Sequence, residues 1–333
     1  MKYTYYILIV LSFALLLSNC KKNNDSDPDT PYVTTPYDLV IPNGFPDLYI
    51  SDDNPLTVEG VQLGRMLFYD SLLDLNNSRA CGGCHFQANS FTRPEVNSLA
   101  HINLGWNGVW LWNGKIEGHL EDIMLFEVEE FFKTDFSKFN SHPSYPELFK
   151  KAFNVDVITS KEASYALAQF ERTMMSANSK WDRYIKGEAT LSPAEAKGFE
   201  VFFTEKGDCF HCHATMLFTD NRFHNNGLDS TPQLGREEIT GDPNDIGKFK
   251  SPTLRNIMLT APYMNDGRYA TIEEVIDFYS EGVVWSPTVD PLMKKVHQGG
   301  VHLLQEDKDN LIAFLKTLTD TSYLHNPELS NPF

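Results

Sequence analysis

The spacing of apolar residues along the chain predicts helices rather than strands. Within residues 160–177, Ala166, Phe170 and Met174 recur every four positions and give a helix one apolar face. Near the C-terminus, a helix beginning around Gln305 carries a stripe with the spacing i, i+3, i+4 and i+7, formed by Leu311, Phe314, Leu315 and Leu318. No convincing run of alternating apolar and polar residues is present. We therefore expect an all-α fold.

Two capping boxes mark where further helices begin. Residues 192–195 read Ser-Pro-Ala-Glu, which combines a capping box with proline at the first helical position. Residues 271–274 read Thr-Ile-Glu-Glu and open a helix that runs to about Tyr279. The segment 186–191, just before the first of these helices, is the best candidate for a domain boundary.

Two Cys-x-x-Cys-His motifs carry the chemistry of the chain. In each, two cysteines one turn apart can form thioethers with the vinyl groups of one haem, and the histidine that follows is held under the iron as proximal ligand. The residues concerned are Cys81, Cys84, His85, Cys209, Cys212 and His213. Because the motifs lie roughly a domain length apart, we expect a di-haem redox protein with two covalently bound haem c groups.

Two other interpretations of the cysteine pairs stay open from the residues alone. Cys-x-x-Cys also supplies half of a tetrahedral zinc cage. Each pair would then need ligands from the other across about 120 residues, whereas zinc ribbons usually close within a few tens of residues. A disulfide within either pair would leave the following histidine without a role. The haem interpretation uses all six residues.

The first twenty residues are typical of an export signal. Lys2 begins a short basic region, residues 5–17 are apolar, and Cys20 stands where a signal peptide would be cleaved, which resembles a bacterial lipobox. The apolar stretch is too short for a comfortable transmembrane helix. We expect residues 1–20 to be a lipoprotein-type signal peptide. Acyl chains on Cys20 would then anchor a periplasmic protein to a membrane.

The rest of the chain divides into three parts. Residues 21–50 are expected to be a flexible tether, since their first part is rich in Asn, Asp, Thr and Pro and almost free of apolar residues. Residues 51–190 and 191–333 each contain one haem motif and are long enough for a domain. No internal repeat beyond the two motifs is visible. We expect two cytochrome c-like haem domains packed together.

The charge of the chain limits its partners. A net charge of −17 argues against a nucleic-acid partner, because phosphate binding needs a basic stripe. An acidic surface favours a basic electron donor.

Beyond the haem motifs, the chain resembles the bacterial di-haem cytochrome c peroxidases and their MauG-type relatives from about Leu63 to Leu318. The supporting segments are residues 63–70, 112–115, 254–256, 260–263 and 266–267. The resemblance implies that the N-terminal haem reacts with hydrogen peroxide. It also implies that the C-terminal haem relays electrons from a small exported cytochrome c or cupredoxin.

The resemblance assigns roles to three residues near the first haem. Trp112 matches the tryptophan of the family's Trp-Asp-Gly-Arg motif, whose indole lies between the two haems and passes electrons. Peroxide cleavage needs a group that shuttles a proton between the two peroxide oxygens. The family's Pro-x-Glu-Met pattern favours Glu129, with Glu130 second, as this catalytic glutamate. An acidic cluster on a solvated helix face is the alternative for both.

One common feature of the family is missing. Many members carry a histidine, in a loop after the first haem motif, that caps the peroxidatic iron, but residues 86–96 contain no histidine. We therefore predict an N-terminal haem that is open without reductive activation, as in the MauG-type branch. His101 and His119 are close enough in sequence to contradict this prediction.

The second haem needs a sixth ligand, and three residues compete for the role. The position of the peroxidases' axial methionine falls on Tyr279, and tyrosine is what the MauG-type branch uses. A phenolate oxygen should lower the haem potential relative to methionine. Met293 and Met264 are the alternatives, and all three could equally be core residues.

Further assignments also follow from the resemblance. A calcium ion between the domains would be held by the Asn97 side chain and by the backbone carbonyls of Thr260 and Pro262. Arg255 would pair with a haem propionate, with a surface arginine as the alternative. Relatives dimerise, so a homodimer is a further expectation.

Three functions are therefore candidates. The first is a peroxidase that reduces hydrogen peroxide with electrons from a small redox protein. The second is a MauG-like oxidase that modifies a partner protein or an organic substrate by long-range electron removal. The third is a non-catalytic di-haem electron carrier.

Overall fold

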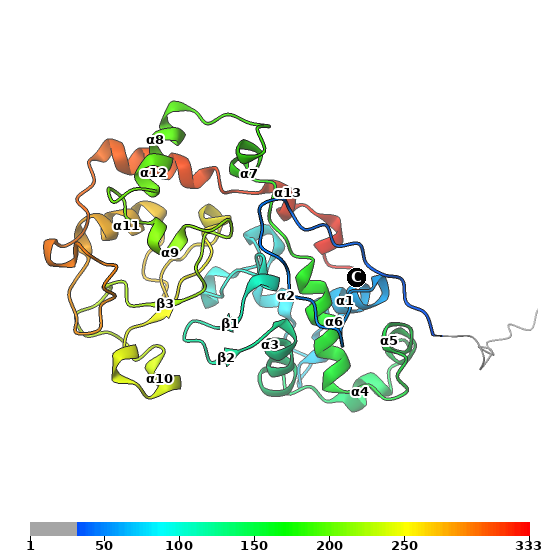
Figure 1. Cartoon of the computed structure of the whole chain (residues 1–333). Coiled ribbons are helices and arrows are strands. Elements are labelled where there is room, and N and C mark those ends of the chain that lie inside the picture. The colour runs from blue at the N-terminus through cyan, green and yellow to red at the C-terminus, as the bar shows by residue number, and fades with distance from the viewer. Residues whose placement is uncertain (1–31) are drawn as a thin grey trace, which may run out of the picture. The chain divides into compact units, whose positions relative to one another are not determined.

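Helices make up most of the regular structure in the described residues, 32–333, of this computed structural model (Figure 1). The expected all-α fold is confirmed, since the strands in this range form only two pairs and each strand is two residues long. From Thr34 to Phe333 the chain forms one unit. The signal peptide and the acylation site at Cys20 lie outside the described residues.

The α-helices are α1 (Val58–Tyr69), α2 (Cys81–Cys84), α3 (Leu120–Phe126), α4 (Phe136–Asn140), α5 (Tyr145–Phe153), α6 (Ser160–Arg172), α7 (Lys180–Ile185), α8 (Pro193–Phe202), α9 (Phe210–His213), α10 (Glu237–Thr240), α11 (Ile272–Asp277), α12 (Gln305–Lys316) and α13 (Thr321–Leu324). Two π-helical turns continue α3 and α11, namely η5 (Glu127–Phe131) and η8 (Phe278–Gly282). The antiparallel strand pairs are β1 (Val109–Trp110) with β2 (Ile116–Glu117), and β3 (Phe223–His224) with β4 (Phe249–Lys250). Short 3₁₀ turns are η1 (Ser71–Leu73), η2 (Gln87–Asn89), η3 (Pro94–Val96), η4 (Leu104–Trp106), η6 (Pro243–Asp245), η7 (Ile257–Leu259), η9 (Val296–Gln298) and η10 (Pro327–Leu329). None of the helices in the described part of the chain has the length and apolar content needed to cross a lipid bilayer.

The first hydrophobic core is built around the crossing of α1 and α6. The two helices approach so closely that a Cβ on Gly64 would fall 1.9 Å from the carbonyl oxygen of Ala166. Phe68 and Phe170 are fully buried beside this crossing. The predicted helix of residues 160–177 ends earlier than expected, at Arg172, although Met174 is buried beyond its end.

The second hydrophobic core is built in the same way around α8 and α12, which cross in Figure 1. A Cβ on Gly198 would fall 1.9 Å from the carbonyl oxygen of Asn310. The capping box at Ser192 begins α8, and α12 begins at Gln305, both as predicted. The predicted apolar stripe is buried, and it comprises Leu311, Phe314, Leu315 and Leu318.

The two cores therefore repeat one scheme, in which a helix before the haem motif crosses a later helix at a glycine. The repeat was not visible in the sequence because it is carried by few identical residues, mainly Gly64 with Gly198 and Phe170 with Phe314.

Both ends of the described chain pack against the first core. Tyr37 packs against the first core, and the carbonyl oxygen of Pro46 accepts from Trp106 Nε1 over 2.9 Å. Tyr37 and Pro46 lie within residues 21–50, where composition alone indicated a tether. At the other end, Tyr323 and Leu329 are buried in the first core, so the chain returns to it after α12.

Candidate haem sites

The first cysteine motif forms a short helix that presents a histidine nitrogen. Cys81–Cys84 form α2, and His85 follows as its C-cap. His85 Nδ1 donates to the carbonyl oxygen of Phe91 over 2.8 Å. A carbonyl can only accept, so the proton lies on Nδ1 and leaves the Nε2 lone pair available to a metal.

The second motif repeats this arrangement. His213 Nδ1 donates to the carbonyl oxygen of Phe218 over 2.9 Å. Burial lowers the pKa values of His213 and His85, that of His85 to about 3, so both imidazoles are neutral at pH 7. A neutral imidazole with a fixed tautomer is what an iron ligand requires.

The described cysteines form neither a disulfide nor a thiolate cage that joins the two motifs. The one described group of potential metal ligands that includes a cysteine joins Cys212 to Asp220 and His224. No group of potential metal ligands among residues 32–333 contains cysteines from both motifs. Each motif instead opens into its own cavity.

The first cavity is lined by the first haem motif and by residues from α3, η5 and α6. Cys81, Cys84 and His85 lie on its wall together with Trp112 and Glu127. Its lining is mostly apolar, as a haem macrocycle requires.

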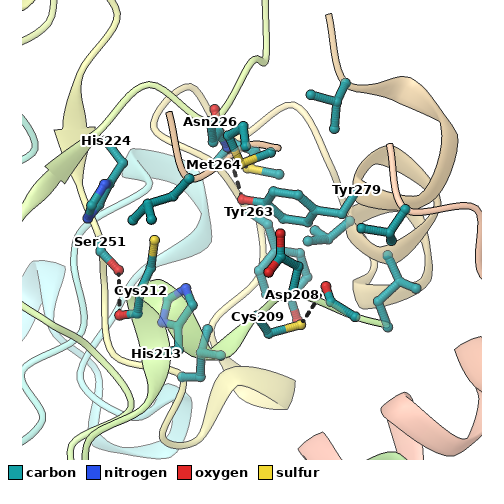
Figure 2. Close-up of a pocket in the computed structure, with 18 of the residues that line it drawn as sticks. Asp208, Cys209, Cys212, His213, His224, Asn226, Ser251, Tyr263, Met264 and Tyr279 are labelled. Carbon is teal, nitrogen blue, oxygen red and sulfur yellow. Dashed lines mark hydrogen bonds between the residues drawn. The ribbon is translucent and has the colours of Figure 1, made fainter. Parts of the chain in front are cut away.

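The second cavity is lined by the second haem motif and by all three candidates for the sixth ligand. Tyr279, Met264 and Met293 contribute to its wall with Cys209, Cys212 and His213. Figure 2 shows Tyr279, Asn226 and Met264 gathered on one side of this pocket, with Cys212 and His213 on the other. The two cavities thus fit one haem each.

Trp112 is shared by both cavities. Its Nε1 donates to the carbonyl oxygen of Asn97 over 3.3 Å, which fixes the indole. Trp110, 5 % exposed, lines only the first cavity, and Trp106 lines neither.

The glutamates predicted to be catalytic do not lie at the first cavity. Glu129 and Glu130 are exposed, and Glu129 Oε1 accepts from Ser160 Oγ over 2.6 Å. Glu127 is the residue of this cluster that lines the cavity. The π-helical turn that begins at Glu127 shifts the face presented to the cavity, and a register taken from a sequence pattern does not anticipate such a turn.

Burial raises the pKa of Glu127 to about 7. The charge of Glu171 acts in the same direction, and that of Arg79 opposes it. A carboxyl group with this pKa is available both as acid and as base at neutral pH.

The internal repeat gives a second reason to single out Glu127. Glu127 and Tyr279 each stand eight residues after a helix N-cap, His119 for α3 and Thr271 for α11. In both cases the helix continues as a π-helical turn. Each of the two side chains also lines the cavity of one haem motif, Glu127 the first and Tyr279 the second.

Tyr279 is partly buried, and its hydroxyl accepts from Asn226 Nδ2 over 3.0 Å. Burial raises the pKa of Tyr279 to about 12, and the hydrogen bond from Asn226 opposes this rise. The same amide nitrogen lies 3.6 Å from Met264 Sδ. Asn226 thus orients two of the three ligand candidates.

Neither nearby histidine is positioned to face His85 across an iron. The His101 ring stacks on the His85 ring with centroids 3.6 Å apart. Two imidazoles that bind one iron from opposite sides point their nitrogens at each other with the metal between them, which this stacking excludes. His119 is exposed and stacks on Tyr49.

Sequence reasoning missed another acid at the first cavity, and this one is fully buried. Glu171 lies on the cavity wall with no hydrogen-bond partner for either oxygen, 3.3 Å from His101 Nδ1. Burial raises its pKa to about 8. In the internal repeat, Phe170 corresponds to Phe314, and the next residues are Glu171 and Leu315. The second cavity therefore has a leucine where the first has Glu171.

The structure gives Arg255, expected to pair with a haem propionate, a partner within the protein. Its guanidinium donates to both carboxylate oxygens of Asp182, over 2.9 and 2.8 Å, and to the carbonyl oxygen of Met216. Arg255 is 1 % exposed and lines neither cavity. The guanidinium N–H groups therefore donate to acceptors inside the protein.

The three expected calcium ligands lie together on the wall of the first cavity. Thr260, Pro262 and Asn97 all contribute to it. Asn97 Nδ2 donates to the carbonyl oxygens of Met264 and Asn265, both over 3.0 Å, which leaves its amide oxygen as the ligand atom. Side-chain and backbone oxygens of this kind suit calcium.

Comparison with known proteins supports this geometry. Residues 58–190 match the family model described as "Di-haem cytochrome c peroxidase". The methylamine utilization protein MauG of Methylorubrum extorquens is 30 % identical over 285 residues, which cover 80 % of this chain and 79 % of that protein. The cytochrome c551 peroxidase of Nitrosomonas europaea is 29 % identical and covers 80 % of this chain and 81 % of its own length.

A solved structure agrees over nearly its whole length. The crystal structure of a MauG-like protein associated with microbial copper homeostasis superposes with a TM-score of 0.81 at 34 % identity, covering 89 % of this chain and 99 % of that one. The di-haem peroxidase BthA of Burkholderia thailandensis, 16 % identical with a TM-score of 0.67, shares the fold. Taken with the two equivalent histidine-bearing cavities, these matches show that the chain belongs to the di-haem cytochrome c peroxidase family.

Proposed function

We propose that this protein is a c-type di-haem peroxidase that reduces hydrogen peroxide to water with electrons from a small exported redox protein. Family membership implies two haem c groups, for which the six motif residues are the attachment and ligand set. When bound, the haems supply one iron at which peroxide is cleaved and a second that relays electrons. The observation that carries the proposal is the partly buried Glu127 on the wall of the His85 cavity.

Glu127 is assigned the proton shuttle. Its raised pKa, about 7, allows the carboxylate to take a proton from peroxide and the carboxylic acid to return it to the departing oxygen. The pair Glu129 and Glu130 is replaced in this role because both side chains are exposed.

Trp112 is assigned the path between the two sites. It belongs to both cavity walls, and its indole is fixed by the hydrogen bond to Asn97. A rigid, polarisable ring between two redox centres is suited to pass electrons without moving.

The N-terminal site is proposed to be open to peroxide in the resting protein. His101 is stacked beside His85 and His119 is at the surface, and Glu127, an acid rather than a strong ligand, holds the place that Tyr279 holds in the second site. Tyr279 is proposed as the sixth ligand of the second haem, with Met264 and Met293 as alternatives on the same wall.

The calcium ion at Asn97, Thr260 and Pro262 remains part of the proposal. So does the lipid anchor at Cys20. The family is typically periplasmic, and a cytochrome c or cupredoxin donor suits that compartment. A homodimer is retained as an expectation from relatives.

The proposal is tested by steady-state reduction of hydrogen peroxide with a reduced small cytochrome as donor. Glu127→Gln should lower kcat/KM by roughly 10² to 10⁴, the range of general acid–base catalysis. Glu129→Gln and Glu130→Gln are matched controls and should stay within a few-fold of the parent. If a control variant loses activity while Glu127→Gln stays active, the proton shuttle is Glu129 or Glu130 rather than Glu127.

A MauG-like oxidase that acts on a partner protein or organic substrate is the second candidate. It is favoured by the tyrosine at position 279 and by the similarity to proteins named MauG and MauG-like. Peroxide-dependent oxidation of an added substrate, with no turnover from any cytochrome or cupredoxin, would select it. Six-coordinate low-spin iron at both haems would instead support the non-catalytic carrier.

A further inference from the structure

Lys250 lies in the wall that separates the two haem cavities. The residue lines both of them and is only 7 % exposed. Among the residues common to both walls it alone carries an ionisable nitrogen, and these residues are Trp112, Lys250, Pro252, Ile257, Tyr263 and Met264.

The backbone holds Lys250 firmly at this place. It lies in β4 opposite Phe223 of β3. Its backbone N–H donates to the carbonyl oxygen of Trp112 over 2.8 Å. The ammonium group stands 6.0 Å from the centre of the Trp110 ring. Lys250 is thus tied to the segment that carries Trp110 and Trp112, of which Trp112 lines both cavities.

The ammonium of Lys250 has no carboxylate partner in the described part of the chain. Other buried cations there are paired: Arg172 with Glu121, Arg255 with Asp182, and Lys308 with Asp277. An unpaired buried charge is costly, and burial accordingly lowers the pKa of Lys250 to about 7. The contrast suggests a partner that the polypeptide itself does not provide.

A haem supplies such a partner, because each macrocycle carries two propionate groups at one edge. We propose that Lys250 is the counter-cation of a haem propionate at the junction of the two sites, and that its charge raises the reduction potentials of both haems. The proposal rests on the presence of two haems but not on peroxidase activity. It also gives the role first expected of Arg255 to a residue that reaches the cavities.

The physical reason for the potential shift is electrostatic. A fixed positive charge disfavours the ferric state, which has one more positive charge than the ferrous state. Because Lys250 faces both cavities, removing its charge should lower both potentials rather than one.

The test is spectroelectrochemical titration of the haem-loaded full chain. Lys250→Met removes the charge and keeps the length of the side chain, and Lys250→Gln is a second neutral variant in case the first is poorly loaded. Lys248→Met is the matched control, since Lys248 is two residues away, pairs with Asp245 at 3.0 Å and lines neither cavity. A downward shift of both potentials in a neutral Lys250 variant, larger than in Lys248→Met, is expected.

Equal potentials in the Lys250 variants and the control would overturn the proposal. Resonance Raman spectroscopy provides an independent measurement in variants that retain haem. The propionate bending bands should move in Lys250→Met and Lys250→Gln and stay in place in Lys248→Met. Unmoved bands would exclude a propionate partner. Haem content is measured first, so failure of the two-haem assignment appears separately as missing Soret absorbance.

Discussion

We predict that the buried pair of Arg255 and Asp182 stabilises the packing of α7 against the segment that follows the second haem motif. Arg255→Met removes two charge-assisted hydrogen bonds and leaves a carboxylate that is 3 % exposed. Breaking a buried ion pair from one side costs about 3–5 kcal/mol, because the remaining charge is uncompensated. Asp182→Asn should cost a similar amount. The double variant should cost less than the sum of the two, by about 0.5–3 kcal/mol.

The pH dependence of this stabilisation follows from the lowered pKa of Asp182. Burial tends to raise that pKa, and the hydrogen bonds and charge of Arg255 more than offset it. A depressed carboxyl pKa contributes stability above the unfolded value, about 4, which is lost as the pH falls through the folded value. The difference between the parent and Asp182→Asn should therefore be full at neutral pH and shrink in acid.

Urea unfolding of the haem-loaded protein, followed by circular dichroism, measures these free energies. Arg268 is the control, since it pairs at the surface with Asp229 and is 32 % exposed. Arg268→Met should cost less than about 1 kcal/mol. If Asp182→Asn is as mild as this control, the stabilising role of the pair is refuted. If Arg255→Met shifts a haem potential by as much as a neutral Lys250 variant does, Arg255 pairs with a propionate as first expected.

Three further predictions concern the repeat and the two sites. Gly64→Ala should destabilise the protein by about 1–3 kcal/mol in the same urea assay despite its better helix propensity, because its methyl group would collide with the Ala166 carbonyl. Gly108→Ala, with nothing within 4 Å of the added Cβ, should be neutral. Tyr279→Phe should change only the low-spin ferric signal in the electron paramagnetic resonance spectrum of the oxidised protein, and an unchanged spectrum would remove Tyr279 as ligand. If Glu127 acts first as base, kcat/KM for peroxide should rise with pH up to its pKa of about 7 and then level off, whereas a pH-independent rate in the parent would contradict this order.

The haem motifs, the helical class and several helix starts could be predicted from the sequence, because each rests on local residues. The capping boxes at Ser192 and Thr271 begin helices as expected, and α12 begins at Gln305. Glu127 could not be identified by matching a family pattern, since a π-helical turn begins there. Tyr279 was placed by the family's axial-methionine position, whereas its equivalence to Glu127 in distance from the helix N-cap is visible only in the structure. The partner of Arg255 was missed because Asp182 is 73 residues away in the chain.

The internal repeat of the two haem sites shows which positions differ between them. Both present a neutral histidine, fixed by a carbonyl, below an apolar cavity, and both place one side chain eight residues after a helix N-cap above it. The sites differ at the equivalent positions, where Glu127 and Glu171 in the first correspond to Tyr279 and Leu315 in the second. In the function proposed above, the acids at the first cavity provide protons for chemistry on a small oxidant, whereas the phenol at the second is the proposed ligand and the leucine excludes water. Exchanging Glu127 for Tyr should therefore turn the first site toward the coordination of the second, with a high-spin ferric signal replaced by a low-spin one, and a retained high-spin signal would show that more than this position separates them.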